Sequence, residues 1–137
     1  MNTSNFSITN KTKGKLPRLP FARLKEEILG DAFDLSIAIV TPKESHRLNL
    51  TYRQKDKPTN VLSFPFDKNS GELVLDIKTA SADAPNFDMT PKKFLLFLVI
   101  HGMLHLKGFE HSSKMESEEH RLCTLFNLLW PEPLQLE

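Results

Sequence analysis

The sequence predicts a small α+β domain in which a mixed β-sheet is packed with helices and one buried helix runs through the centre. Two β-rich runs joined by a turn-forming segment indicate a hairpin in the sheet. One stretch with helical end signals is apolar on nearly all sides, which is typical of a helix inside a domain. With 137 residues and neither an internal repeat nor a linker-like run, the chain is expected to form one domain over 1–137.

The first half of the chain predicts a helix, a strand and a second helix. Apolar residues recur at helical spacing over 21–30, a stretch that ends in glycine, and we expect a helix there. The β-rich run LSIAIV over 35–40 predicts a strand. Thr41 is followed by proline and then by Glu44, which is the pattern of an N-cap with a capping-box acid. A helix should therefore run from there to about Arg53.

A hairpin is predicted in the middle of the chain. The runs VLSFPF over 61–66 and ELVLDI over 72–77 are rich in β-forming residues, and the turn-forming DKNSG between them favours an antiparallel pair. Pro65 lacks a backbone donor, so the first of these strands should lie at an edge of the sheet. The segment 81–88 contains proline and asparagine and predicts a loop.

Two helices are expected in the last third of the chain. A Thr-Pro pair opens a helix over 91–106 that is apolar on nearly all sides and should therefore lie in the middle of the domain. Gly108 can end this helix, and Ser113 with Glu116 has the pattern of a capping box for the next one. The apolar stripe of that last helix, expected to face the core, comprises Met115, Leu122, Phe126 and Leu129.

The composition argues against secreted and membrane-spanning classes. Cys123 is the only cysteine, so no intramolecular disulfide can form, and we expect a cytoplasmic protein. The longest apolar stretch runs from Phe94 past His101 to Leu106 and falls short of the roughly 20 residues of a membrane-spanning helix. The N-terminal stretch lacks the apolar core of a signal peptide, so neither export nor membrane insertion is expected.

Basic residues are unevenly distributed, although the net charge is only +1. Up to Lys25 the chain has no acidic residue, and we expect 1–15 to form a flexible basic arm that is either solvated or in contact with phosphate groups. The segment from Glu110 onward is acidic, so a polyanionic partner should lie on the other side. A second basic cluster comprises Arg47, Arg53, Lys55 and Lys57, of which Arg47, Lys55 and Lys57 are candidates for substrate binding.

The segment HGMLHLKGFEH places three of the chain's five histidines at positions i, i+4 and i+10. His101 and His105 lie one helical turn apart, so their imidazoles can converge on one cation. Gly108 allows the chain to leave the helix and return His111 to the same point. Three neutral imidazoles with a fourth position left for water are typical of a catalytic zinc site. Because no sulfur ligand is present, nickel or another divalent metal can take the place of zinc.

The remaining histidines and the residue after His101 limit the chemistry. His46 and His120 are predicted to lie on helix surfaces, and Cys123 is expected in the core, on the last helix. Metzincin proteases share the histidine spacing but carry a glutamate directly after the first histidine, where this chain has Gly102. No general base then stands beside a metal-bound water at that position, which argues against the standard protease mechanism.

Three blocks of the sequence resemble, in matching order, the signature blocks of the YbeY family of endoribonucleases. They are LNLTYRQKDKPTNVLSFPF over 48–66, GELVLD over 71–76, and HGMLHLKGFEH over 101–111 with Met115. The resemblance implies a metal-dependent, single-strand-specific endoribonuclease that acts in ribosomal RNA maturation, at the end of the small-subunit RNA, and in ribosome quality control. The implied partners are single-stranded or ribosomal RNA, the small ribosomal subunit and its assembly proteins, whereas DNA is not expected.

The resemblance also implies roles for particular residues. Arg53, in the YR pair of the first block, matches the family's functional arginine. Asn60 and Glu110 depart from the family pattern, because each stands where the family has aspartate. The change at Glu110 keeps the carboxylate, whereas the change at Asn60 removes a charge. By motif position, the metal ligands are His101, His105 and His111.

Several roles stay open at the level of sequence. Arg53 is expected to neutralise charge that develops on phosphoryl oxygens, with a surface salt bridge as the alternative. Glu110 is a candidate for orienting a histidine, for acting as a base, or for favouring the start of the last helix through its charge. Two other functions also remain open: a metalloprotease-like or other small-molecule hydrolase, and a ribosome-binding factor whose metal is structural.

Overall fold

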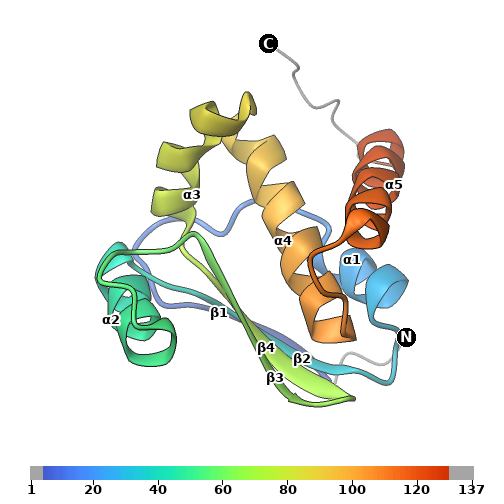
Figure 1. Cartoon of the computed structure of the whole chain (residues 1–137), viewed down its shortest axis with the longest axis horizontal. Coiled ribbons are helices and arrows are strands. Elements are labelled where there is room, and N and C mark those ends of the chain that lie inside the picture. Colours follow the sequence, from blue (N-terminus) through green and yellow to red (C-terminus); the bar gives the residue numbers. More distant parts are fainter. Residues whose placement is uncertain (1–4, 130–137) are drawn as a thin grey trace.

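The computed structural model describes residues 5–129, and within that range it has an α+β fold built on a four-stranded mixed sheet. Helix α4 crosses the sheet near the centre of the molecule (Figure 1). The predicted fold class is therefore confirmed. In chain order the elements are β1 (Phe6–Asn10), α1 (Phe21–Ile28), β2 (Asp34–Ile39), α2 (Pro42–Arg53), β3 (Val61–Asp67), β4 (Ser70–Leu75), α3 (Ile77–Asp83), the 3-10 helix η1 (Ala84–Phe87), α4 (Pro91–Lys107) and α5 (Ser113–Leu129).

The strands of the sheet are ordered β1-β2-β4-β3. β1, β2 and β4 run parallel, and β3 and β4 form the antiparallel hairpin that the sequence predicts. Strand β3 lies at the edge of the sheet, which confirms the expectation from Pro65, because an edge strand leaves one row of backbone groups unpaired. Side chains alternate between the faces of the sheet: Leu73 and Leu75 join the main core, whereas Val74 joins a smaller cluster.

Strand β1 is absent from the elements that the sequence predicts, and it occupies part of the segment 1–15. Phe6 and Ile8 pack against the main core, and the Leu35 N–H donates a 2.9 Å hydrogen bond to Asn5 O. The expectation of a flexible arm is therefore wrong for this strand. The sequence did not indicate β1 because two inward-facing apolar side chains make only a weak alternating pattern. The partner of β1, strand β2, is also distant in the sequence.

The segment 81–88, predicted as a loop, belongs largely to helices α3 and η1. Asp76 caps α3, since its side chain accepts a 2.9 Å hydrogen bond from the Thr79 N–H. Asp76 is fully buried and also accepts a 2.6 Å hydrogen bond from Ser45 Oγ, so it ties α2 to the start of α3. Ala80 is buried in the core. The prediction failed because this buried cap and the packing outweigh the turn preference of proline and asparagine.

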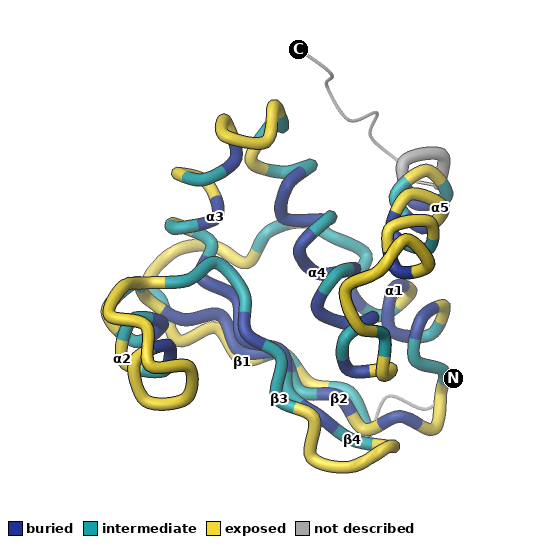
Figure 2. The backbone as a smooth tube through the Cα atoms, viewed as in Figure 1, coloured by how far each residue is buried: buried dark blue, intermediate teal, exposed yellow. Residues whose placement is uncertain are grey.

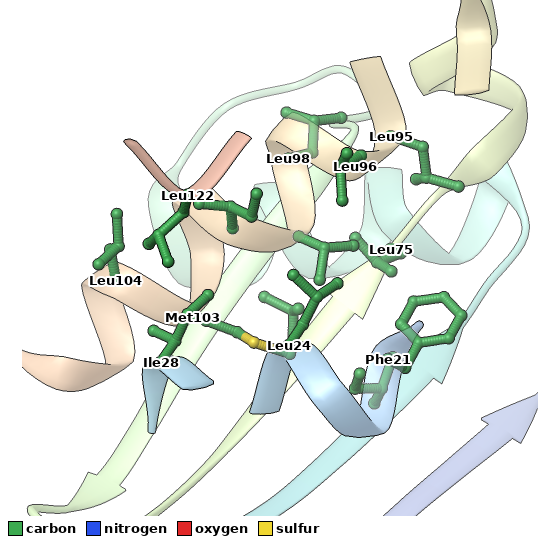
Figure 3. Packing of buried hydrophobic residues seen from close by; sticks show 14 of the residues in the cluster. Phe21, Leu24, Ile28, Leu75, Leu95, Leu96, Leu98, Met103, Leu104 and Leu122 are labelled. Atoms are coloured by element: carbon green, nitrogen blue, oxygen red, sulfur yellow. The ribbon is translucent and has the colours of Figure 1, made fainter. Parts of the chain in front are cut away.

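The main core lies between the sheet and helix α4, which is buried along most of its length (Figure 2). Figure 3 shows Leu24 and Ile28 of α1 and Leu122 of α5 among the apolar side chains of α4. Leu48 of α2 packs against the smaller cluster on the other side of the sheet. Across residues 5–129, no helix combines the length and the apolar character that crossing a bilayer requires.

Helix α5 begins at the predicted residue but is capped by its neighbour. Ser112 Oγ accepts a 3.2 Å hydrogen bond from the Met115 N–H, so Ser112 is the capping residue. The predicted capping box of Ser113 and Glu116 is therefore wrong, because the capping serine is the preceding residue. The sequence does not distinguish two adjacent serines as caps. The side chain of Leu129 lies outside the described residues, and the rest of the predicted stripe is buried: Met115, Leu122 and Phe126.

Gly102 lets helix α4 approach the sheet closely. A Cβ atom at this position would overlap the Leu73 side chain on β4 and lie 3.2 Å from Ser63 Oγ on β3. Ser63 Oγ also donates a 3.1 Å hydrogen bond to Gly102 O. Position 102 therefore faces the sheet, and the glutamate that metzincin proteases carry at this point of the motif has no room here.

We expect Gly102→Ala to lower the free energy of unfolding, although alanine is the better helix former. Alanine contributes about 1 kcal/mol through helix propensity, whereas overpacking a filled core costs about 1–3 kcal/mol. Chemical denaturation should therefore show a net loss, and Gly102→Glu should not fold because it also buries a charge.

Gly14→Ala is the matched control, since a Cβ atom there has Thr12 Oγ1 at 3.7 Å as its nearest neighbour. A midpoint for Gly102→Ala as high as that of the wild type would show that the sheet yields to the added methyl group, against this prediction.

Candidate metal centre

Three histidines converge near the C-terminal end of α4. One ring nitrogen from each of His101, His105 and His111 lies within 4.8 Å of the others. The ring centroids are 4.6 Å apart for His101 and His105, and 4.7 Å apart for His105 and His111. The convergence that the i, i+4, i+10 spacing predicts is therefore present, and these residues form a group that can hold a metal ion.

The outer ring nitrogens of two of these histidines are held by neighbouring oxygens. His101 Nδ1 contacts a carboxylate oxygen of Glu119 on α5, and His105 Nδ1 lies 3.0 Å from the Phe109 carbonyl oxygen. Both partners accept hydrogen bonds, so each Nδ1 carries the proton and each Nε2 presents a lone pair. The two Nε2 atoms face each other at 3.1 Å.

This donor set fits a metal ion. Two nitrogen lone pairs that face each other repel unless a cation lies near both, and three imidazoles suit zinc, nickel or copper-type metals rather than calcium or magnesium. Burial, and then the nearby His101, lower the pKa of His105, which favours the neutral ring that binds metals. Carboxylate and carbonyl partners on the outer nitrogens are also typical of metal-binding histidines.

Helix α4 ends at its cap residue, Gly108, and the turn that follows places the third histidine, His111. Gly108 has a φ of 109°, which favours glycine, and its N–H donates to His105 O over 3.0 Å. The Phe109 N–H donates to Leu104 O over 3.0 Å, and the two bonds together form a Schellman motif. The turn sets the Phe109 carbonyl against the His105 ring and carries His111 back toward the helix end. The predicted role of Gly108 is confirmed.

The histidines line a cleft with a volume of about 880 Å³. Its walls come from α4, β3, η1 and the C-terminal end of α2. Arg53, the last residue of α2, is exposed and lines the same cleft. The structure therefore brings the arginine and the three histidines that the sequence singles out into one cleft, although they are far apart along the chain.

The other predicted basic residues lie outside this cleft. Lys55 and Lys57 line an adjacent cavity of about 280 Å³, and Arg53 lines both cavities. Arg47 lies on α2 and donates to Glu44 over 2.9 Å and 2.8 Å. This pairing lowers the pKa of the Glu44 carboxyl. Arg47 lines neither cavity. Two of the three proposed substrate-binding residues thus lie beside the cleft.

Glu119, and not Glu110, is the carboxylate that contacts a histidine of the triad. Orienting a histidine is one of the roles considered for Glu110 from the sequence. Glu119 is buried against His101, whereas Glu110 is exposed and is not among the residues that line the cleft. Sequence reasoning missed Glu119. The signal was present, since Glu119 lies between Met115 and Leu122 on the apolar stripe of α5. A carboxylate on a stripe that faces the core needs a polar partner.

We expect Glu119→Gln to weaken zinc binding by about ten- to a hundredfold, because loss of the carboxylate lowers the basicity of His101 and loosens its orientation. Competition with a chromophoric chelator measures the change. Glu118→Gln is the matched control, since the Glu118 carboxylate accepts from Arg121 at 3.0 Å on an exposed part of α5. Equal zinc affinity in the two variants would mean that the Glu119 contact does not support the site.

Asn60, which stands where the resemblance implies aspartate, has a local partner in the structure. Asn60 Nδ2 donates a 2.9 Å hydrogen bond to Asp83 Oδ2, and its backbone oxygen accepts from the Asp76 N–H over 3.0 Å. An ionised aspartate at position 60 would place a second carboxylate against Asp83. The amide therefore suits the acidic neighbour that this chain provides, and Asn60 holds the cleft wall to α3.

The histidines and cysteine outside the triad lie where the sequence predicts. His46 Nε2 lies 2.6 Å from Asp56 Oδ1 in a half-exposed pair, and His120 is exposed. Cys123 packs against the main core, and burial, followed by the charge of Glu119, raises the pKa of its thiol to about 11. Its thiol is therefore protonated and unreactive at neutral pH.

Comparisons with known proteins agree with this site. The family model described as Endoribonuclease YbeY matches residues 2–125, a range that includes Arg53 and all three histidines. The solution structure of TM1509 from Thermotoga maritima is similar to this chain with a TM-score of 0.67 and 28% sequence identity, over 91% of each chain. This chain therefore belongs to the YbeY family of endoribonucleases.

Proposed function

We propose that this protein is a metal-dependent endoribonuclease that cuts single-stranded RNA. Its proposed place of action is ribosomal RNA maturation in the cytoplasm, at the 3′ end of the small-subunit RNA, together with ribosome quality control. The observation that carries the proposal is a histidine triad fit for a metal ion in the same cleft as Arg53. Family membership supports RNA as the substrate. The small ribosomal subunit and its assembly proteins are the proposed partners.

The histidines would hold one zinc ion, with nickel or another divalent metal as the alternative. When bound, the ion supplies Lewis-acid stabilisation of the phosphoryl group and lowers the pKa of a coordinated water to roughly 7. Glu119 and the Phe109 carbonyl keep the rings of His101 and His105 oriented. Because these contacts are formed in the protein itself, the ligand nitrogens need little reorganisation when a metal binds.

Arg53 is proposed to contact the phosphoryl oxygens at the cut site. Among residues 5–129, its guanidinium has no hydrogen-bond or ion-pair partner, so the surface salt bridge considered from sequence is not formed there. A guanidinium donates two parallel hydrogen bonds to a phosphate, which suits charge that grows on those oxygens. Arg53 would therefore act on the transition state more than on the bound substrate.

The flanking charged residues have secondary proposed roles. Lys55 and Lys57 would contact phosphates of the strand beyond the cut site, because their cavity adjoins the cleft. Arg47 stays a predicted contact, with its charge already balanced by Glu44. Glu110, exposed in the turn before His111, is proposed as the proton acceptor for the attacking water. Its alternative is a favourable charge at the start of α5.

The two rival functions have less support in the structure. A metzincin-type protease needs a glutamate where Gly102 packs against the sheet. A purely structural metal would be expected to hold the domain together, yet the main core consists of buried apolar side chains and the histidine rings lie at its margin. Hydrolysis of RNA is therefore the function that the site supports best.

Zinc-loaded protein is expected to cut a labelled single-stranded RNA and to leave the same sequence intact within a duplex. Cleavage should stop when a chelator removes the metal, because the described cleft offers no other source of an activated water. Gel electrophoresis measures both. Protein carrying His105→Ala, purified in parallel, controls for contaminating ribonucleases. Cleavage of a peptide or ester panel, with RNA left intact, would instead support the small-molecule hydrolase.

A further inference from the structure

Two exposed aromatic side chains line the cleft of the metal centre. Tyr52 and Phe87 are among the exposed large apolar residues of the described chain, with 61% and 55% of their surface accessible. Both line the cleft that holds the three histidines. Exposed aromatic rings are unfavourably hydrated, and their placement in a binding cleft indicates a ligand that covers them.

Phe87 begins a row of rings that ends at the metal centre. Its ring stacks on Phe94 with centroids 4.8 Å apart and planes inclined by 19°. Phe94 stacks on Phe97 at 6.2 Å and 13°, and Phe97 lies 5.7 Å from the His101 ring. Phe94 is buried, so it covers one face of Phe87. A flat ligand that stacks on the Phe87 ring would continue this row.

The backbone holds Phe87 in place. Phe87 is the last residue of η1, and the next residue, Asp88, takes a left-handed conformation with φ 55°. The Asp88 N–H donates to Pro85 O over 3.1 Å, and the Met89 N–H donates to Ala84 O over 3.2 Å. These bonds close the turn around Phe87. The ring is thus presented from a fixed backbone, which reduces the entropy that a ligand has to overcome.

Tyr52 presents a second ring from another wall of the cleft. It lies on α2 directly before Arg53, and its ring meets Phe64 on β3 edge to face, with centroids 5.2 Å apart and planes at 70°. This contact fixes the ring while most of the residue stays exposed. The cleft therefore has an aromatic ring beside the arginine and another at the end of the row from His101.

The charges around these rings favour a polyanion as the ligand. Arg53 lines the cleft next to Tyr52, and Lys55 and Lys57 line the adjoining cavity. The acidic residue of that cavity, Asp83, already accepts a hydrogen bond from Asn60. Aromatic platforms beside a positively charged groove are the features by which proteins bind single-stranded nucleic acids.

We propose that the rings of Phe87 and Tyr52 stack on bases of the RNA strand whose phosphate lies at the histidines. This inference rests on the proposed function, because it takes RNA as the ligand of the cleft. It also supplies a physical reason for single-strand specificity. Bases in a duplex are stacked on one another and their faces are inaccessible, whereas bases of a single strand turn outward onto aromatic side chains.

The test compares binding of a short oligoadenylate with binding of a strand of the same length that lacks its bases. The measurement is made with the metal removed by a chelator, so that the strand is not cut, and a gel confirms that the RNA is intact afterwards. Wild-type protein should bind the base-bearing strand at least tenfold more tightly. Phe87→Leu and Tyr52→Leu, which keep apolar contacts with Phe94 and Phe64, should each reduce that preference by about five- to tenfold. Affinity for the strand without bases should not change.

Phe66→Leu is the matched control, because Phe66 is 66% exposed on β3 but does not line the cleft. It should keep the wild-type preference. Phe87→Trp should keep or increase the preference, since the larger ring also stacks. Thermal unfolding of each variant verifies the fold. An unchanged preference in both folded leucine variants would overturn the proposal, as would an equal loss in Phe66→Leu.

The outcome is separable from that of the proposed function. If the base preference depends on Phe87 and Tyr52 but zinc-loaded protein leaves RNA intact, the stacking sites stand and the nuclease proposal fails. If RNA is cut and the preference is the same in all variants, the nuclease proposal stands and the stacking proposal is refuted.

Discussion

Replacing His101, His105 or His111 with alanine is expected to abolish stoichiometric zinc binding and, with it, the cleavage of RNA. Each histidine supplies one of the three protein ligands that the described residues offer. Two imidazoles hold zinc far less tightly than three. In His105→Ala and His111→Ala, Glu119 stays bound to the outer nitrogen of His101 and cannot take the place of the lost ligand. Activity should then fall to the level of the chelated wild type.

Elemental analysis after dialysis measures the metal, and gel electrophoresis measures the cleavage. His46→Ala and His120→Ala are matched controls, because both residues lie outside the triad and should keep one metal per chain. Stoichiometric zinc in His111→Ala, the most exposed of the three positions, would remove that residue from the site and leave a two-histidine centre.

The fold of the metal-free protein separates the enzyme from the ribosome-binding alternative. A metal that binds only the folded state adds about 4 kcal/mol when its free concentration is a thousand times the dissociation constant. Chelation should therefore lower the melting temperature, but the protein should stay folded because the main core between sheet and α4 does not include the histidines. Complete unfolding on chelation at room temperature would favour a structural metal.

Arg53→Ala is expected to lower the cleavage rate by a factor of about a hundred to a thousand while fold and zinc content stay intact. The side chain is exposed, so its removal leaves no cavity in the core. It is expected to stabilise charge that grows on the phosphoryl oxygens, and RNA affinity should accordingly fall much less than the rate. Single-turnover kinetics with saturating enzyme separate the two effects.

Two further variants test the geometry of this role. Arg53→Lys should restore only part of the rate, because lysine supplies the charge without the paired donors. Arg121→Ala is the control and should cut RNA nearly as fast as the wild type, since its guanidinium is bound to Glu118 on α5 and it does not line the cleft. A wild-type rate for folded, zinc-loaded Arg53→Ala would refute the catalytic role. Equal losses in affinity and overall efficiency would make Arg53 a binding residue.

The sequence by itself determined the features whose causes are local. Thr41 accepts from the Glu44 N–H, and Thr90 opens α4 in the same way, because a capping residue and its helix are neighbours in the chain. The histidine spacing is local in the same sense, since helix geometry and the turn at Gly108 suffice to bring the three rings together. Arg53 became a candidate for a catalytic role only through resemblance to a family motif.

Only the tertiary structure decided the features whose partners lie far away in the chain. Strand β1 exists because β2 offers it a parallel edge, and α3 exists because a buried Asp76 caps it. Glu119 reaches His101 because α5 packs beside α4, and position 102 excludes a glutamate because α4 rests on the sheet. Each of these contacts is set by packing between elements, which the preferences of neighbouring residues do not encode.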